Sequence, residues 1–195
     1  MEKYKDKYRI PSARHRYHDY SEGTYFVTIC TQEKKHYFGE VIDKEVQLSK
    51  LGRYAEYCLQ QIPVKNQQVL LHSYIVMPNH VHLVIHLDRP VETSQCGVLD
   101  NDKKIPLSAN IQMETPHCDV STKMKNIANS CGRLSHIISQ FKSAVTRFAK
   151  EEQIPFCWQA RFHDHIIKDF KRFEKIMNYV ITNDEHWEKD CFNEP

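Results

Sequence analysis

Two apolar segments, residues 69–77 (VLLHSYIVM) and 80–87 (HVHLVIHL), constrain the fold most, because together they predict a β-hairpin. A Pro-Asn pair separates them, which is typical of a tight turn. Strand side chains alternate between two faces, so the apolar residues of the second segment can enter a core from one face. His80 and His82 then lie together on the other face, where they can share one partner.

The other periodic segments complete an α+β prediction. Alternating or β-branched runs predict strands at 23–31 and 162–168, and 3.6-residue periods predict helices at 49–63, 132–152 and 169–183. The first helix is expected to end at Pro63. The first six elements follow the βαββαβ order of a ferredoxin-like fold, an antiparallel sheet with helices on one face. A C-terminal helix is added to it.

Chain length and composition suggest one ordinary globular domain over residues 1–195. Residues 1–22 are expected to form an N-terminal arm, and the polar segment 88–127 a long insertion or loop. No apolar run is long enough to span a membrane, and the charged start lacks a signal-peptide core. Seven cysteines without a C-x-x-C pair suggest reduced thiols in the cytosol.

A tyrosine on the predicted last helix is the second candidate for chemistry. His80 and His82 are the first candidates, because paired neutral imidazoles are good ligands for a divalent metal ion. Tyr179 is expected to project nearly opposite the apolar residues of its helix, with Lys175 one turn before it and Asn183 one turn after. The residues expected to pack on the sheet are Phe170, Phe173, Met177, Val180 and Ile181. A phenol near a metal can attack a phosphodiester, although a surface aromatic is the plainer interpretation.

Four motifs together resemble a known family. LHSYIVMPNHVHLVI, SHIISQFKSAVTRFAK, WQARFHDHIIKD and MNYVITND are similar, in this order, to motifs of the HUH single-tyrosine transposases of small insertion sequences. The REP-associated tyrosine transposase branch is the most similar, and GTYFVTICT and HYFG resemble it as well. The resemblance runs from about residue 14 to 187, apart from the 88–127 insertion.

The resemblance implies a DNA-cleaving site. His80 and His82 match the metal-binding pair, Tyr179 matches the nucleophile, and Asn183 matches a polar residue that helps to hold the metal. The family uses Mg²⁺ or Mn²⁺ and has the ferredoxin-like fold. Its tyrosine nicks single-stranded, hairpin-containing DNA through a 5′-phosphotyrosine intermediate and then transfers the strand. Such a protein is expected in the prokaryotic cytosol or nucleoid, as a monomer or a homodimer.

Basic and polar residues outside this site are candidates for DNA contacts. The formal net charge of +2 is too small to indicate nucleic-acid binding by itself, so local groups matter more. The candidates are Arg14, Lys142, Arg147, His165, Arg172 and Lys175. Trp158 is either a packing corner or a base-stacking edge. Two other functions stay open: a DNA-hairpin-binding module without turnover, and a metal-dependent nuclease in which water attacks.

Overall fold

A four-stranded antiparallel sheet forms the centre of the protein. The computed structural model describes residues 3–4, 7–8, 20, 22–89 and 132–193. The strand order in the sheet is β6-β7-β3-β8. The strands are β3 (Gly23–Cys30), β6 (Val69–Val76), β7 (His80–Leu87) and β8 (His163–Ile167). With α1 (Lys50–Lys65) after β3 and α3 (Arg133–Glu151) before β8, the predicted βαββαβ order is confirmed.

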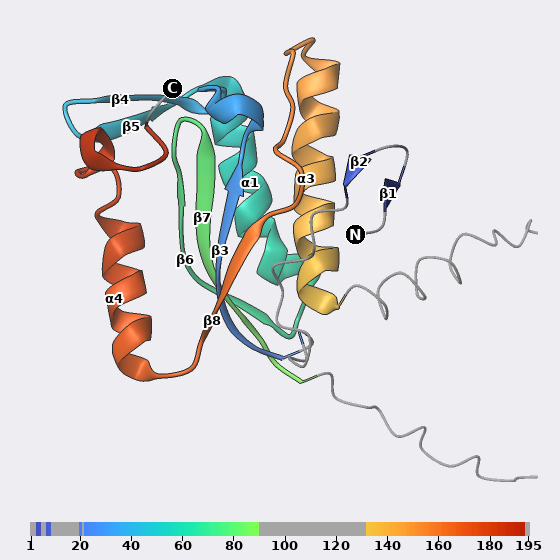
Figure 1. Cartoon of the computed structure of the whole chain (residues 1–195), viewed down its shortest axis with the longest axis vertical. Coiled ribbons are helices and arrows are strands. Elements are labelled where there is room, and N and C mark those ends of the chain that lie inside the picture. The colour runs from blue at the N-terminus through green and yellow to red at the C-terminus, as the bar shows by residue number, and fades with distance from the viewer. Residues whose placement is uncertain (1–2, 5–6, 9–19, 21, 90–131, 194–195) are drawn as a thin grey trace, which may run out of the picture.

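Helices lie on both faces of the sheet, as Figure 1 shows. On one face α1 and α3 cover the main core, to which β3 contributes Tyr25, Val27 and Ile29. The predicted burial of the apolar face of β7 is confirmed, because Val81 and Leu83 are completely buried in this core. The other face is covered by the helix that follows the sheet, α4 (Phe170–Ile181).

The packed side of α4 differs from the predicted one. A smaller apolar cluster joins Val180 to Val84 and Ile167, with Phe173, Ile176 and Met177 partly buried against it. Phe170 and Ile181 were expected to pack on the sheet, but they are 73% and 61% exposed. Because Ile176 packs inward, the buried stripe is rotated toward the side of the helix on which Tyr179 lies.

A small β-hairpin precedes α1 and was not predicted. It consists of β4 (Gly39–Ile42) and β5 (Glu45–Leu48). The backbone just before the hairpin packs closely on α1, because a Cβ on Gly52 would lie 2.0 Å from the Phe38 carbonyl oxygen. Its strands have only four residues each, too few for a clear alternating pattern in the sequence.

Helix α1 continues past its predicted end, since Pro63 lies inside it. Pro63 removes one backbone N–H donor from the helix, and Asn66 closes the last turn by donating from both its backbone and its side-chain nitrogen to the Ile62 carbonyl. The short elements are β1 (Lys3–Tyr4), β2 (Lys7–Tyr8), and the 3₁₀ turns η1 (Gln32–Lys34) and η2 (Trp187–Lys189).

Most of the predicted insertion, 90–127, and most of the predicted arm lie outside the described residues. Tyr20 is described, and its ring stacks on Tyr25 with centroids 5.5 Å apart. In the described part of the chain, no helix has the length and apolar character that crossing a membrane requires.

Candidate active site with a metal-binding histidine pair

His80 and His82 lie side by side on the α4 face of β7. Their ring centroids are 4.4 Å apart, and both side chains are almost completely buried. The antiparallel register fixes this face, because Thr28 of β3 pairs directly with His82 and Cys30 pairs with His80. The strand therefore gives one face to the main core and uses the other to bring two imidazoles together.

The orientation of His80 is fixed by Asn79 in the β6–β7 turn. The Asn79 side-chain nitrogen donates to the carbonyl oxygens of Lys34 and Phe192, at 3.1 and 2.7 Å. Its side-chain oxygen must therefore face His80, and it accepts from His80 Nδ1 at 2.9 Å. A proton on Nδ1 leaves Nε2 with a free lone pair, which is the form of histidine that binds metals.

His82 links the strand to the tyrosine of α4. Its Nδ1 lies 2.9 Å from the hydroxyl oxygen of Thr28, and its Nε2 lies 3.3 Å from the hydroxyl oxygen of Tyr179. Burial lowers the pKa of His82 to about 4, and burial together with the neighbouring His82 lowers the pKa of His80 well below its ordinary value. Both rings are thus neutral at pH 7, as a metal ligand must be.

Tyr179 reaches the histidines from the edge of the packed side of α4. Tyr179 is 42% exposed, and its ring and that of Phe26 make a T-shaped contact with centroids 6.0 Å apart. The prediction that Tyr179 points nearly opposite the apolar stripe is therefore wrong. Ile176, three residues earlier, and Asn183, four residues later, both turn inward, so Tyr179 lies beside them on the same side of the helix.

The phenol of Tyr179 is in its neutral form in this environment. Burial raises its pKa, and so does the charge of Asp190, whereas a hydrogen bond with the Asn183 side chain lowers it. Lys175, one turn before Tyr179, is exposed on α4 and is not among the groups that shift this pKa.

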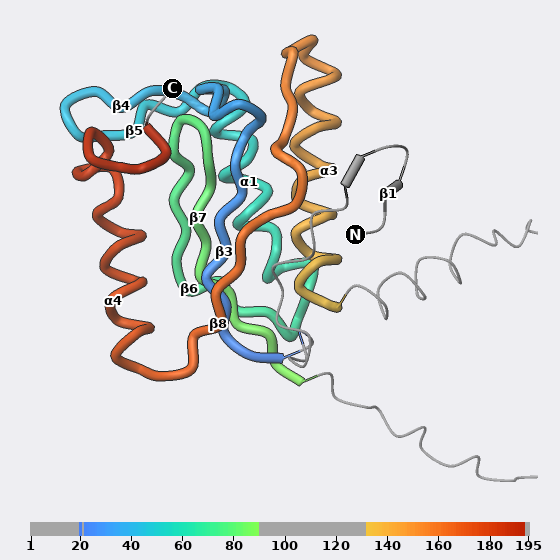
Figure 2. The backbone as a smooth tube through the Cα atoms, viewed as in Figure 1, coloured from blue at the N-terminus to red at the C-terminus, as the bar shows by residue number. Residues whose placement is uncertain are grey.

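A carboxylate that the sequence did not single out lies beside the histidines. After α4 the chain turns back toward the β6–β7 turn (Figure 2), and this brings Asp190 to the site. Phe192 and Trp187 hold the segment in place, with ring centroids 4.5 and 6.1 Å from that of His80. Asp190 is one of 25 acidic residues, and nothing in the local pattern WEKDCF distinguishes it.

These side chains fit a divalent cation. Ligand atoms of His80, His82 and Asp190 lie within 4.8 Å of one another. Among the described residues, three buried polar side-chain atoms have no hydrogen-bond partner: His80 Nε2, Asn183 Oδ1 and Asp190 Oδ2. Burying a polar atom without a hydrogen-bond partner costs free energy. A cation would accept the lone pairs of nitrogen and oxygen atoms of this kind. The His80–His82 pair can therefore hold a metal ion.

The residues predicted to contact DNA are spread over several surfaces. Arg14 lies outside the described residues. His165 is exposed on β8 opposite Phe26, and Arg172 is exposed on α4 in an ion pair with Asp169. Arg147 is exposed on α3, on the other side of the sheet from Tyr179. Lys142, also on α3, donates to the carbonyl oxygens of Gln159 and Arg161 at 2.8 and 2.9 Å, so its ammonium holds this segment against the helix.

Comparisons with known proteins identify a relative by sequence and a similar solved structure. No protein-family model matches the chain. A solved structure of a REP-associated tyrosine transposase bound to a REP hairpin is similar, with 14% identity and a TM-score of 0.46 over 88% of this chain and 72% of that one. The sequence motifs resemble the same branch. An uncharacterized protein of Haemophilus influenzae (strain ATCC 51907 / DSM 11121 / KW20 / Rd) is 30% identical over 181 residues, which cover 92% of this chain and 90% of the relative. With this identity over nearly the whole of both chains, the protein belongs to the same family as that Haemophilus influenzae protein.

Proposed function

We propose that this protein nicks single-stranded DNA and transfers the strand, with Tyr179 as the nucleophile. The observation that carries the proposal is the contact between two distant segments: the Tyr179 hydroxyl lies 3.3 Å from Nε2 of His82, next to His80. This kind of phosphoryl transfer requires a nucleophile and a metal-binding pair within reach of the same phosphate. The motifs that resemble HUH single-tyrosine transposases have their histidines and tyrosine at these positions.

The proposed reaction exchanges one phosphate ester for another. The Tyr179 oxygen forms a bond to phosphorus while the bond from phosphorus to the 3′ oxygen breaks, leaving a 5′-phosphotyrosine and a free 3′-hydroxyl. The proton lost by the phenol balances the proton gained by the 3′ oxygen. Strand transfer is the reverse reaction with another 3′-hydroxyl.

The protein side chains have distinct roles in this proposal. His80, His82 and Asp190 would hold Mg²⁺ or Mn²⁺, with Asn183 as a further oxygen donor. When bound, the cation supplies positive charge that stabilises the non-bridging phosphate oxygens and the phenolate. Asn183 orients the Tyr179 hydroxyl, and Asn79 holds His80 with Nε2 toward the site.

A covalent-capture experiment tests the proposal. The protein is incubated with Mn²⁺ and a pool of single-stranded oligonucleotides that carry hairpins with randomised flanks, and adducts are separated on a denaturing gel. We expect a protein–DNA adduct with the wild type and none with Tyr179→Phe. Tyr57→Phe is the matched control, because Tyr57 is an exposed tyrosine on α1. Sequencing the captured DNA would identify the hairpin and the cleavage site.

The other outcomes would overturn the proposal in distinguishable ways. DNA cleavage that forms no adduct and that persists in Tyr179→Phe would indicate a nuclease in which water attacks. Binding of the pool without cleavage by any variant would indicate a DNA-binding module.

A further inference from the structure

A groove on the outer side of α3 is not used by the proposed cleavage site. It is a cavity of about 620 Å³ between α3 and the segment 158–162 that leads into β8. Its lining residues extend along α3 from Ser135 to Lys150, which at 1.5 Å per residue is roughly 22 Å. The groove is thus longer than a site for one small anion. We refer to it as the α3 groove.

The wall of the α3 groove is held in place by several hydrogen bonds. The ammonium of Lys142 donates to two carbonyl oxygens of the facing segment, and Trp158 Nε1 donates back to the Lys142 carbonyl oxygen at 3.1 Å. The Trp158 ring packs on Phe156 and Phe38, with centroids 4.9 and 5.4 Å away, so Trp158 is a packing corner. Both sides of the groove are therefore preorganised.

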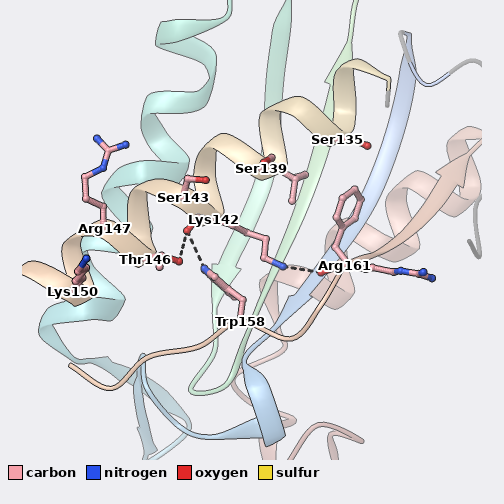
Figure 3. A pocket seen from close by; sticks show the side chains of 11 residues that line it. Ser135, Ser139, Lys142, Ser143, Thr146, Arg147, Lys150, Trp158 and Arg161 are labelled. Atoms are coloured by element: carbon pink, nitrogen blue, oxygen red, sulfur yellow. Dashed lines mark hydrogen bonds between the residues drawn. The ribbon is translucent and has the colours of Figure 1, made fainter. Parts of the chain in front are cut away.

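The chemistry of the lining suits a chain of phosphates. Arg147 and Lys150 lie at one end of the row of labelled side chains, and Arg161 lies at the other (Figure 3). Exposed hydroxyls of Ser139 and Ser143 lie between them. The lining described here contains no acidic side chain. Guanidinium, ammonium and hydroxyl groups are the usual partners of nucleic-acid phosphates.

The strand β8 connects the α3 groove to the tyrosine site. It is the outer strand of the sheet, so the path around its edge leads from one face to the other. Arg161 lines the groove, and two residues later His163 pairs with Thr28, whose hydroxyl contacts His82. His165 pairs with Phe26, which lies against Tyr179. Exposed His163 and His165 thus lie between the groove and the cleavage site.

We propose that the α3 groove binds the single-stranded DNA that flanks the phosphate attacked by Tyr179. The strand passes around the β8 edge along His165 and His163, and its phosphates contact Arg161, Arg147 and Lys150. Phe162, which also lines the groove, offers apolar surface to the bases. This inference rests on the proposed function for the identity of the ligand, but its test does not depend on cleavage.

The test measures binding of a fluorescein-labelled 20-nucleotide oligo(dT) by anisotropy at several salt concentrations. We expect Arg147→Gln combined with Lys150→Gln to weaken binding by about tenfold and to reduce the slope of log K against log salt by about 1.4, or 0.7 for each lost phosphate contact. Lys44→Gln combined with Lys65→Gln removes the same charge from exposed positions elsewhere and should leave the affinity and the salt slope unchanged. Equal melting temperatures verify that the variants fold.

Two results would overturn the inference. One is an unchanged affinity and salt slope in the Arg147/Lys150 variant. The other is displacement of the oligonucleotide by a poly-glutamate peptide at equal charge concentration, which would indicate an acidic protein partner. Tyr179→Phe should bind the oligonucleotide like the wild type. A missing covalent adduct with intact groove binding would therefore contradict the cleavage proposal alone.

Discussion

Asp190 is the carboxylate that lies beside the histidine pair, and its contribution to metal binding can be measured separately from the proposed DNA cleavage. Removing its charge should weaken metal binding, because the charge count of the ligands sets the affinity for a divalent cation. We expect Asp190→Asn to raise the Kd for Mn²⁺ by about tenfold or more, measured by calorimetric titration. Glu188→Gln removes an exposed carboxylate from the same segment and serves as the control. Equal affinities in the two variants would contradict a ligand role for Asp190.

The buried neutral histidines should make the metal-free protein sensitive to acid. The pKa of His82 is about 4 in the folded protein and near its ordinary value of 6.5 in the unfolded chain. The unfolded chain therefore binds more protons between these values, and the folded state loses stability as the pH falls from 6.5 to about 4. At about 1.4 kcal/mol per pKa unit, His82 contributes a loss of about 3 kcal/mol.

Urea unfolding at several pH values in the presence of a chelator measures this effect. His82→Gln should show a shallower dependence on pH than the wild type over this range. A stability that is the same at pH 6.5 and pH 4.5 would contradict the neutral, buried state of the histidines.

At the scale of elements, the docking of α4 decides whether Tyr179 reaches the histidines. Val180 is completely buried between α4 and the sheet, whereas its neighbour Ile181 is exposed. We expect Val180→Ala to reduce the free energy of unfolding by about 2 kcal/mol through loss of buried methyl groups. Ile181→Ala should change it by less than about 0.5 kcal/mol. Chemical denaturation of both variants measures the difference, and equal effects would contradict this packing of α4.

The helix period predicted that α4 exists but not how it is rotated. Its apolar residues span an arc of roughly 140°, from Ile176 to Ile181, and the pattern alone does not say which part of this arc is buried. The contact with Phe26, Val84 and Ile167 selects Ile176 and Val180 for burial. Tyr179 then comes to the edge of the interface, which no local pattern could indicate.

At the scale of the whole molecule, the element order and the division of the strand faces were predictable. Both follow from periods of two and 3.6 residues that are strong in β7 and α3. The third component of the site was not predictable, because the position of Asp190 beside His80 depends on how α4 packs on the sheet. The sequence separation of these residues is too large for any short motif to reveal the contact.

A bound cation would join β7 to the segment after α4, so metal binding should stabilise the entire fold. With Mn²⁺ at about 100 times its Kd, the free energy of unfolding should rise by about 2.7 kcal/mol. Thermal unfolding with Mn²⁺ and with excess chelator measures this gain. The double variant His80→Ala with His82→Ala should show no gain, and an equal gain in that variant would place the cation elsewhere.

The position of Asp190 also has a consequence for protein synthesis. A ribosome that adds roughly 5 to 20 residues per second needs about 5 to 20 s to proceed from His80 to Asp190. During most of this interval the nascent chain carries the histidines without α4 and its tyrosine, and during all of it without the carboxylate. The histidine–carboxylate cluster can therefore assemble only once synthesis has reached Asp190, so no shorter nascent chain carries the complete candidate site.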